Sequence, residues 1–277
     1  MHRVDLQKLA PGLLNREPGI WFAPRQRDIS YPAHGNAACL DVEDGSFWFQ
    51  HRNRCIASVV QRFAPRGVFL DVGGGNGFVA SALLRAGIQC VLLEPGLEGA
   101  RAALARGVEP VICATLEEAG LLPGSVAAVG MFDVLEHIED DVGALQQVHR
   151  LLEPGGRVFL TVPAYQLLYS ADDDAAGHFR RYTRSGLRRV LQSAGFQIEF
   201  ASYIFAPLPP LILLMRTVPS RLGMRSQPKT GLDTTAHAPR GMVARLLDRL
   251  LAAERARLAG GRTLPLGGSV LCAATRR

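Results

Sequence analysis

Cysteine is scarce in this 277-residue chain, and its five copies are widely separated. Their number is odd and no two form a CxxC pair, which excludes a disulfide framework or a cysteine zinc site. Long apolar runs are missing too. The longest, residues 204–215, has twelve residues with three prolines, whereas roughly 20 are needed to span a bilayer. Since the N-terminus also lacks the apolar stretch of a signal peptide, we expect a soluble cytoplasmic protein.

Strong charge of one sign is also missing from most of the chain. Charged residues make up 20% and apolar residues 48%, an ordinary globular balance. The formal net charge is +6, and between Arg216 and Arg262 there are ten Lys and Arg against three acidic residues. Because no basic face is spread over the whole chain, we expect no nucleic-acid partner. Because of the one basic stretch, weak contact with an anionic membrane surface stays an open alternative.

Short β-branched runs alternate with stretches rich in Ala, Leu and Arg through the middle of the chain. Glycine-containing turns separate them. This alternation predicts βαβ units, and hence a doubly wound α/β fold with a mostly parallel sheet and helices on both faces. The expected strands are residues 67–72, 88–94, 108–113, 126–132, 157–162, 196–203 and 268–275, and the expected helices are 78–86, 96–106, 140–152, 183–194 and 242–258.

We expect one domain with two additions. Residues 1–64 are interpreted as an N-terminal covering segment, and residues 65–203 with 266–277 as the core. Residues 204–265 break the alternation, and we interpret them as an inserted lid or cap because a strand that returns after an insertion usually rejoins the sheet. The insertion contains an amphipathic helix with five apolar residues on one face: Val243, Leu246, Leu247, Leu250 and Leu251.

The most informative motif is LDVGGGNGFVA at residues 70–80, where an acidic residue ends a strand and a glycine-rich turn opens a helix. Glycines let a ligand approach the backbone closely, and open α/β sheets bind ligands at the carboxyl ends of their strands. Asp71 suits a ligand with an ammonium group better than a pyrophosphate. Glu94, at the end of the next strand, can accept both hydroxyls of a ribose. Since residues 75–80 also fit the dinucleotide pattern G-x-G-x-x-G/A, a nicotinamide cofactor stays open.

Four motifs in register, LDVGGGNG, the end of VLLEPG, FDVLEHIEDD and LLEPGGRVFLTVP, resemble the seven-stranded class I S-adenosylmethionine-dependent methyltransferases, in their type 11/12-like branch. The resemblance covers about residues 45–203 and the last strand. It implies a seven-stranded sheet, S-adenosyl-L-methionine as cofactor and S-adenosyl-L-homocysteine as product. It also implies the cofactor-binding residues: Asp71, Gly73, Gly75 and Gly77 at the methionine moiety, Glu94 and Pro95 at the ribose, Thr115 and Leu116 at the adenine, Phe132 and Asp133 beside the sulfonium, and Arg52 or Arg54 at the methionine carboxylate.

The chain departs from the family pattern after the third strand. Many relatives carry an acidic residue there for the adenine amino group, and this chain has Cys113, Ala114 and Thr115. The resemblance therefore implies that a backbone group or the Thr115 hydroxyl takes that role.

Methyl transfer from a sulfonium is an in-line displacement, so the protein mainly has to align a nucleophile with the methyl carbon. A general base helps when that nucleophile arrives protonated. The candidates are His137 in FDVLEHIEDD, and Tyr165 and His178 after the fifth strand, where the family places acceptor residues. The D-x-x-E-H run also resembles a divalent-ion site of some family branches. We expect no metal and keep one alternative, a site made by Asp133, Glu136, His137 and His178.

The sequence favours methylation of a small-molecule acceptor, apolar or amphiphilic, of the kind met in secondary metabolism. Oxygen is preferred as the methylated atom, with nitrogen and carbon left open. Two alternatives remain: an NAD(P)-dependent oxidoreductase that uses the same glycines, and a non-catalytic relative that only binds S-adenosylmethionine. A monomer and a homodimer are both compatible with the sequence.

Overall fold

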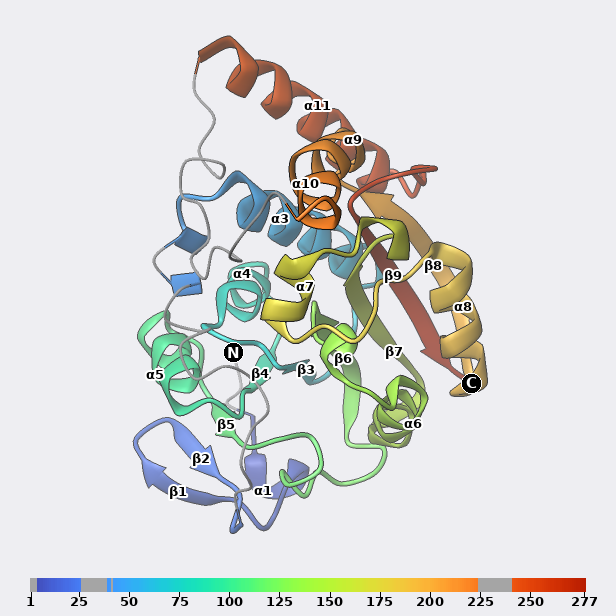
Figure 1. Cartoon of the computed structure of the whole chain (residues 1–277). Helices are drawn as coiled ribbons and strands as arrows, with labels where there is room; N and C mark the ends of the chain where they lie inside the picture. The colour runs from blue at the N-terminus through green and yellow to red at the C-terminus, as the bar shows by residue number, and fades with distance from the viewer. Residues whose placement is uncertain (1–3, 26–38, 41, 224–240) are drawn as a thin grey trace.

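The computed structural model describes residues 4–25, 39–40, 42–223 and 241–277. Within these residues the centre of the molecule is a nine-stranded sheet with helices on both faces (Figure 1). The strand order is β1-β2-β5-β4-β3-β6-β7-β9-β8. The strands are β1 (Leu14–Glu17), β2 (Ile20–Phe22), β3 (Phe69–Val72), β4 (Cys90–Leu93), β5 (Val111–Cys113), β6 (Val126–Phe132), β7 (Leu152–Pro163), β8 (Phe196–Ile204) and β9 (Ser269–Arg276).

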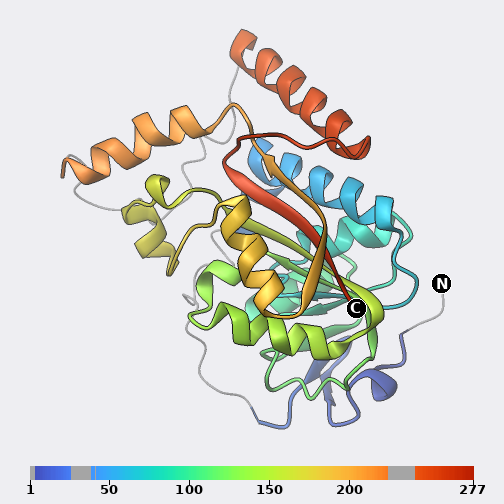
Figure 2. The ribbon, with the colours of Figure 1, turned by 90° about the vertical axis from the view of Figure 1, so that its right-hand side faces the viewer.

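Helices cover both faces of this sheet (Figure 2). On one face the buried side chains of α3, α4, α5 and α11 form a single apolar cluster with the sheet, and on the other face α1, α6 and α8 form a second cluster. The α/β prediction is therefore confirmed. The helices are α1 (Leu6–Leu9), α3 (Phe47–Phe63), α4 (Phe78–Arg85), α5 (Leu97–Ala105), α6 (Asp141–Leu151), α7 (Ala171–Ala176), α8 (Arg184–Ser193), α9 (Pro209–Ile212), α10 (Val218–Arg221) and α11 (Gly241–Ala259), with short turns η1 (Leu135–His137) and η2 (Gln166–Leu168) and the π-turn η3 (Leu213–Thr217).

The central strands run parallel, so their carboxyl ends meet at one edge of the sheet. β3 pairs in parallel with β4 and β6, and β6 with β7, whereas β9 is antiparallel to both β7 and β8. Every residue of β3, β4, β5 and β6 is buried. These strands read as continuous apolar runs because helices cover them on both sides.

The sheet is wider than the seven strands that the resemblance implied. The two additional strands, β1 and β2, form a hairpin within residues 1–64, and β2 pairs in parallel with β5. Gly19 turns the hairpin with φ +81°. Strands of four and three residues are too short to show a hydrophobic period, and the sequence therefore predicted none here.

The lid segment also differs from expectation. Leu246 and Leu250 on α11 are 59% and 47% exposed, and the buried positions include Leu251, Glu254 and Leu258, so the apolar face is rotated from the predicted one. A second difference lies at β7, which begins at Leu152 instead of residue 157, because residues 153–156 bulge out of the ladder with β6.

None of the described helices is both long enough and apolar enough to cross a membrane.

Candidate active site

A glycine-rich turn joins β3 to α4. Gly73, Gly75 and Gly77 have φ of +64°, +54° and +74°, a left-handed conformation that side-chain-bearing residues rarely adopt. Space is restricted as well, since a Cβ on Gly77 would stand 2.9 Å from the Cα of Ala103, and one on Gly73 2.8 Å from a methyl carbon of Val134. Glycine at both positions is therefore required for the turn, which leaves bare backbone at the carboxyl end of β3.

Asp71 lies on β3 just before this turn and is 1% exposed. Its Oδ2 has no hydrogen-bond partner among the described residues. Burial raises the pKa of Asp71 to about 7; the Arg52 guanidinium opposes this rise and the Glu94 carboxylate adds to it. Leaving such an oxygen buried and unpaired is costly, so the position is suited to a ligand group that donates hydrogen bonds or carries positive charge.

Glu94 directly follows β4, two residues beyond Leu92, which pairs with Asp71 on the neighbouring strand. One carboxylate oxygen accepts the backbone N–H of Gly75 and the other that of Gly96, both at 2.8 Å. The carboxylate thereby holds the glycine turn against the start of α5. Pro95, the next residue, is half-buried, and its carbonyl accepts the thiol of Cys113 at 3.6 Å.

Helix α3 brings cationic and amide groups to the same end of the sheet. Arg52 forms an ion pair with Asp133, which follows β6. Asn53 donates to the carbonyl of Phe78, the first residue of α4, at 2.9 Å. Arg54 is exposed, and the one hydrogen bond from its side chain to a described residue is a long 3.4 Å contact with Gln50. Of the two predicted arginines, the structure brings only Arg52 to the site.

The predicted adenine residues form a small capped turn. The Thr115 hydroxyl donates to Glu118 at 3.0 Å and accepts the Glu118 N–H at 3.3 Å. Leu116 is half-buried. Sequence reasoning missed Glu118, whose Oε1 is buried without a hydrogen-bond partner among the described residues. The T-x-x-E capping pattern was the signal that could have found it.

The residues after β6 adopt a special backbone conformation. Asp133 has φ +57°, which Asp tolerates better than most residues, and its N–H donates to the Thr161 carbonyl at 2.9 Å. Phe132 instead faces the core, where its ring stacks on Phe69 with centroids 6.5 Å apart. The structure thus separates two neighbours that the sequence treated as one unit.

His178 is held by a buried carboxylate. Its Nδ1 lies 2.8 Å from Asp173 Oδ1, and Arg181 donates to both oxygens of Asp173, at 2.7 and 3.0 Å. Burial alone would raise the pKa of Asp173, but the hydrogen bonds from His178 and Arg181 outweigh it and lower the pKa to about 2. Asp173 is therefore ionised and keeps the ring proton of His178 on Nδ1, which leaves the Nε2 lone pair available to a ligand.

His137 and Glu136 lie next to His178. The two imidazole rings meet edge-on with centroids 4.7 Å apart. Burial and the neighbouring His178 lower the pKa of His137 to about 4, whereas burial and the Asp133 charge raise that of Glu136 well above its usual range. Of the four residues in the alternative metal site, three bring their ligand atoms within 4.8 Å of one another, and Asp133 pairs with Arg52 instead.

Tyr165 is directed away from these groups. Its ring stacks on Tyr203 with centroids 5.0 Å apart. Burial, followed by its hydrogen bond with Tyr203, raises the pKa of Tyr165 to about 12. The phenol therefore stays protonated, and a protonated phenol cannot take a proton from an acceptor.

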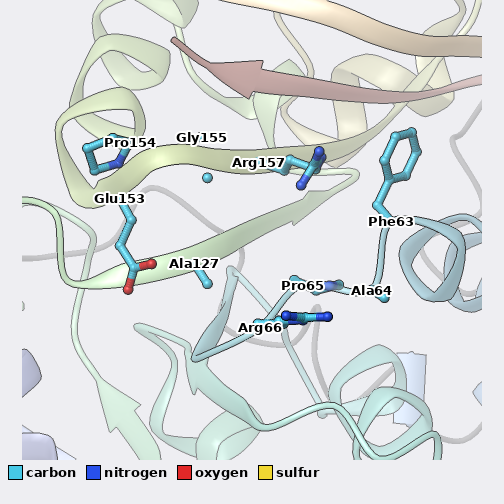
Figure 3. Close-up of a pocket in the computed structure, with 10 residues that line it drawn as sticks. Phe63, Ala64, Pro65, Arg66, Ala127, Glu153, Pro154, Gly155 and Arg157 are labelled. Atoms are coloured by element: carbon cyan, nitrogen blue, oxygen red, sulfur yellow. The ribbon is translucent and has the colours of Figure 1, made fainter.

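A hollow of about 400 Å³ lies at the other end of the sheet. It is lined by Phe63 at the end of α3, by Arg66 after this helix, and by residues 153–157 at the start of β7 (Figure 3). Its position beside Ala127, at the start of β6, places it away from the glycine turn.

The site and the fold together define a Rossmann-like nucleotide-binding protein. A family model for a methyltransferase domain matches residues 48–199, more than half of the chain. The chain belongs to this methyltransferase family.

Individual relatives agree with this assignment. A probable S-adenosylmethionine-dependent methyltransferase of Mycolicibacterium smegmatis is 27% identical over 180 residues, which cover 63% of this chain and 68% of that protein. A ubiquinone biosynthesis O-methyltransferase of Xanthomonas oryzae is 32% identical over 98 residues, which cover 33% of this chain and 41% of that protein. The chain thus matches less than half the length of the second relative.

Among solved structures, the phosphoethanolamine N-methyltransferase 2 of Haemonchus contortus in complex with S-adenosyl-L-methionine has a TM-score of 0.55 and 19% identity, covering 88% of this chain and 57% of that one. At this identity the likeness shows the fold alone. Taken together, the matches show an enzyme that uses S-adenosylmethionine and decide against a nicotinamide oxidoreductase.

Proposed function

We propose that this methyltransferase acts on a hydroxyl group of a small, largely apolar acceptor and that His178 is its general base. The observation that carries the proposal is the chain of hydrogen bonds from Arg181 through Asp173 to His178. It holds one imidazole in a single tautomer next to the residues that follow β6. A base held in this way is useful for an acceptor that must lose a proton, as a hydroxyl does.

The residues at the glycine turn fit S-adenosylmethionine. The unpaired Oδ2 of Asp71 suits an ammonium group, the carboxylate oxygens of Glu94 suit the hydroxyls of a ribose, and Arg52 suits a carboxylate. When bound, the cofactor supplies an electrophilic methyl group on its sulfonium. The further residues that we propose to line its site are Gly73, Gly75, Gly77, Pro95, Thr115, Leu116 and Asp133, together with the backbone of Phe132, whose ring lies in the core.

Three groups beside His178 support the transfer of a proton from the acceptor hydroxyl. His178 Nε2 takes the proton of the acceptor hydroxyl, and ionised Asp173 stabilises the imidazolium that forms. His137, with its pKa lowered to about 4, stays neutral and adds no positive charge beside His178. Burial and the Asp133 charge raise the pKa of Glu136, which favours its neutral form beside the two imidazoles.

Exposed apolar side chains in the segment around His178 and in the proposed lid support an apolar acceptor. Leu167 and Phe179, in the segment that carries His178, are exposed, as are Leu211 and Leu214 in the proposed lid. Oxygen as the methylated atom agrees with the name of the Xanthomonas relative.

The same exposed leucines, with the basic stretch of residues 216–262, favour weak contact with an anionic membrane surface. In this proposal residues 1–64 are the N-terminal covering segment and residues 204–265 are the lid. The enzyme is proposed to work in the cytoplasm.

The test is turnover to S-adenosylhomocysteine with a panel of phenols, catechols and matched aryl amines. His178→Gln is expected to lower turnover of the hydroxyl acceptor about a hundredfold while S-adenosylhomocysteine affinity stays unchanged. Asp173→Asn should act in the same direction. His149→Gln is the control, because His149 lies on α6 against Phe196. Full activity of His178→Gln, or turnover of amines alone, would contradict the proposal.

A further inference from the structure

The proposed lid begins with a residue in an unusual conformation. Phe205 directly follows β8 and has φ +61°, a region that a bulky residue enters only when its surroundings hold it there. Its ring stacks on Trp48 of α3, with centroids 3.8 Å apart and planes 5° from parallel, and meets His51 of the same helix edge-on at 5.0 Å. The first turn of the lid therefore packs directly on α3.

A buried carboxylate from α11 holds the same turn. The backbone N–H groups of Phe205 and Ala206 donate to Oε1 and Oε2 of Glu254, at 2.6 and 2.9 Å. Glu254 is also 2.7 Å from Nε2 of His51, and both side chains are almost fully buried. Hydrogen bonds to a buried charge are among the stronger ones in proteins. Three separate segments thus converge on one carboxylate.

The protonation of His51 follows from its other neighbour. Arg255 Nη1 lies 3.3 Å from His51 Nδ1, and a guanidinium can only donate. Nδ1 therefore accepts, and the ring proton sits on Nε2, from which it is donated to Glu254. This tautomer argues against a metal ion bound by His51, Cys55 and Glu254, although their ligand atoms lie within 4.8 Å. A metal on Nε2 would move the proton to Nδ1, facing Arg255.

Helix α3 carries the lid contacts and the cofactor-side contacts on adjacent residues. Trp48 and His51 contact the lid, while Arg52 pairs with Asp133 and Asn53 binds the carbonyl that opens α4. Because consecutive residues of one helical turn move together, a shift of α3 at Trp48 and His51 would also shift Arg52.

We propose that Glu254 and His51, here called the Glu254 latch, are positioning residues that couple the placement of the lid to the cofactor-binding end of α3. The inference rests on the proposed function, in which Arg52 contacts the cofactor. Coupling between two sites is reciprocal. If packing of Phe205 and Ala206 against α3 increases the affinity for the cofactor, cofactor binding favours that packing by the same factor.

The experiment measures amide hydrogen exchange over residues 205–223 with and without S-adenosylhomocysteine, together with its dissociation constant by calorimetry. In the wild type the ligand should slow exchange at the start of the lid. Glu254→Gln is expected to speed that exchange about tenfold without ligand, since the two N–H groups donate to different oxygens and the amide nitrogen that replaces one of them cannot accept. It should also raise the dissociation constant about tenfold.

His51→Phe and His51→Gln form a matched pair. The phenylalanine keeps an aromatic ring beside Phe205 but cannot donate to Glu254, so exchange in the lid should no longer respond to the ligand. The glutamine can donate through its amide and should restore the response. Leu258→Ala is the stability control: Leu258 is fully buried on α11, and its loss should lower the unfolding temperature while leaving the response intact.

Two outcomes would overturn the latch. In the first, the ligand slows exchange in the lid of both Glu254→Gln and His51→Phe as much as in the wild type. In the second, this slowing is lost equally in Leu258→Ala. If Glu254→Gln does not fold, the two His51 variants decide. If the wild type binds no S-adenosylhomocysteine, the proposed function fails. The exchange rate of the lid in Glu254→Gln then still tests the latch, and an unchanged rate rejects it.

Discussion

Replacing Asp71 with Asn is expected to stabilise the cofactor-free enzyme and to weaken cofactor binding about a hundredfold. Burial raises the pKa of Asp71 from 3.8 to about 7, so the folded protein binds this proton more tightly than the unfolded chain does. The gap corresponds to about 4 kcal/mol of destabilisation once the group is ionised. This penalty is absent below about pH 4, grows as the pH rises toward 7, and is constant above that pH.

Asn removes the charge and can still accept the hydrogen bond from the Ala80 backbone. Urea unfolding at pH 5 and pH 8 should therefore show Asp71→Asn more stable than the wild type by up to about 4 kcal/mol at pH 8 and by less at pH 5. Calorimetry should show S-adenosylhomocysteine affinity reduced about a hundredfold, the effect of losing a hydrogen bond to a charged ligand group. Asp248→Asn, at an exposed site on α11, is the control. A variant that is less stable at pH 8, or a stability difference that ignores pH, would refute the reasoning.

Three further predictions concern the turn, the Asp173 carboxylate and the metal alternative. Gly77→Ala should lower the free energy of unfolding in urea by about 2 kcal/mol or more, because Gly77 has a positive φ and lies close to Ala103. Gly87→Ala, with a similarly positive φ but open space around it, should lower it less. Equal losses would show that the close contact does not matter. Asp173, with a pKa of about 2 in the folded protein, should contribute about 2 kcal/mol above pH 4 that disappears toward pH 2, so Asp173→Asn and the wild type should converge in stability in acid. Dialysis against EDTA should leave turnover unchanged, and a loss restored by Mg²⁺ or Mn²⁺ would instead show that Glu136, His137 and His178 hold an ion.

The core of the fold could be predicted because its signals are local. β3 and β4 are apolar runs followed by glycine-containing turns, and both acidic residues there, Asp71 and Glu94, are read directly from the sequence. Their neighbourhood follows from parallel pairing alone. The glycine turn is equally local, because its φ values and the need for bare backbone depend on residues that are consecutive in the chain.

The contacts that orient side chains could not be predicted in the same way. Successive helical residues turn by about 100°, so Arg52 and Arg54 leave α3 in opposite directions, and only packing decides which faces the site. On α11 the buried face includes a charged residue, Glu254, which an apolar pattern does not mark as buried. The exposed Leu246 and Leu250 instead suggest an apolar face where there is none. The partner of His51 is 203 residues away in sequence, and no short-range pattern reports such a pair.

The hairpin of β1 and β2 has a consequence for assembly. An open sheet margin exposes a row of unpaired N–H and C=O groups, which can recruit a strand from another molecule. Here the chain's own β2 occupies that place along β5, and this margin is therefore closed to intermolecular strand pairing through β5. A chain trimmed to begin at α3 would uncover β5 and should self-associate.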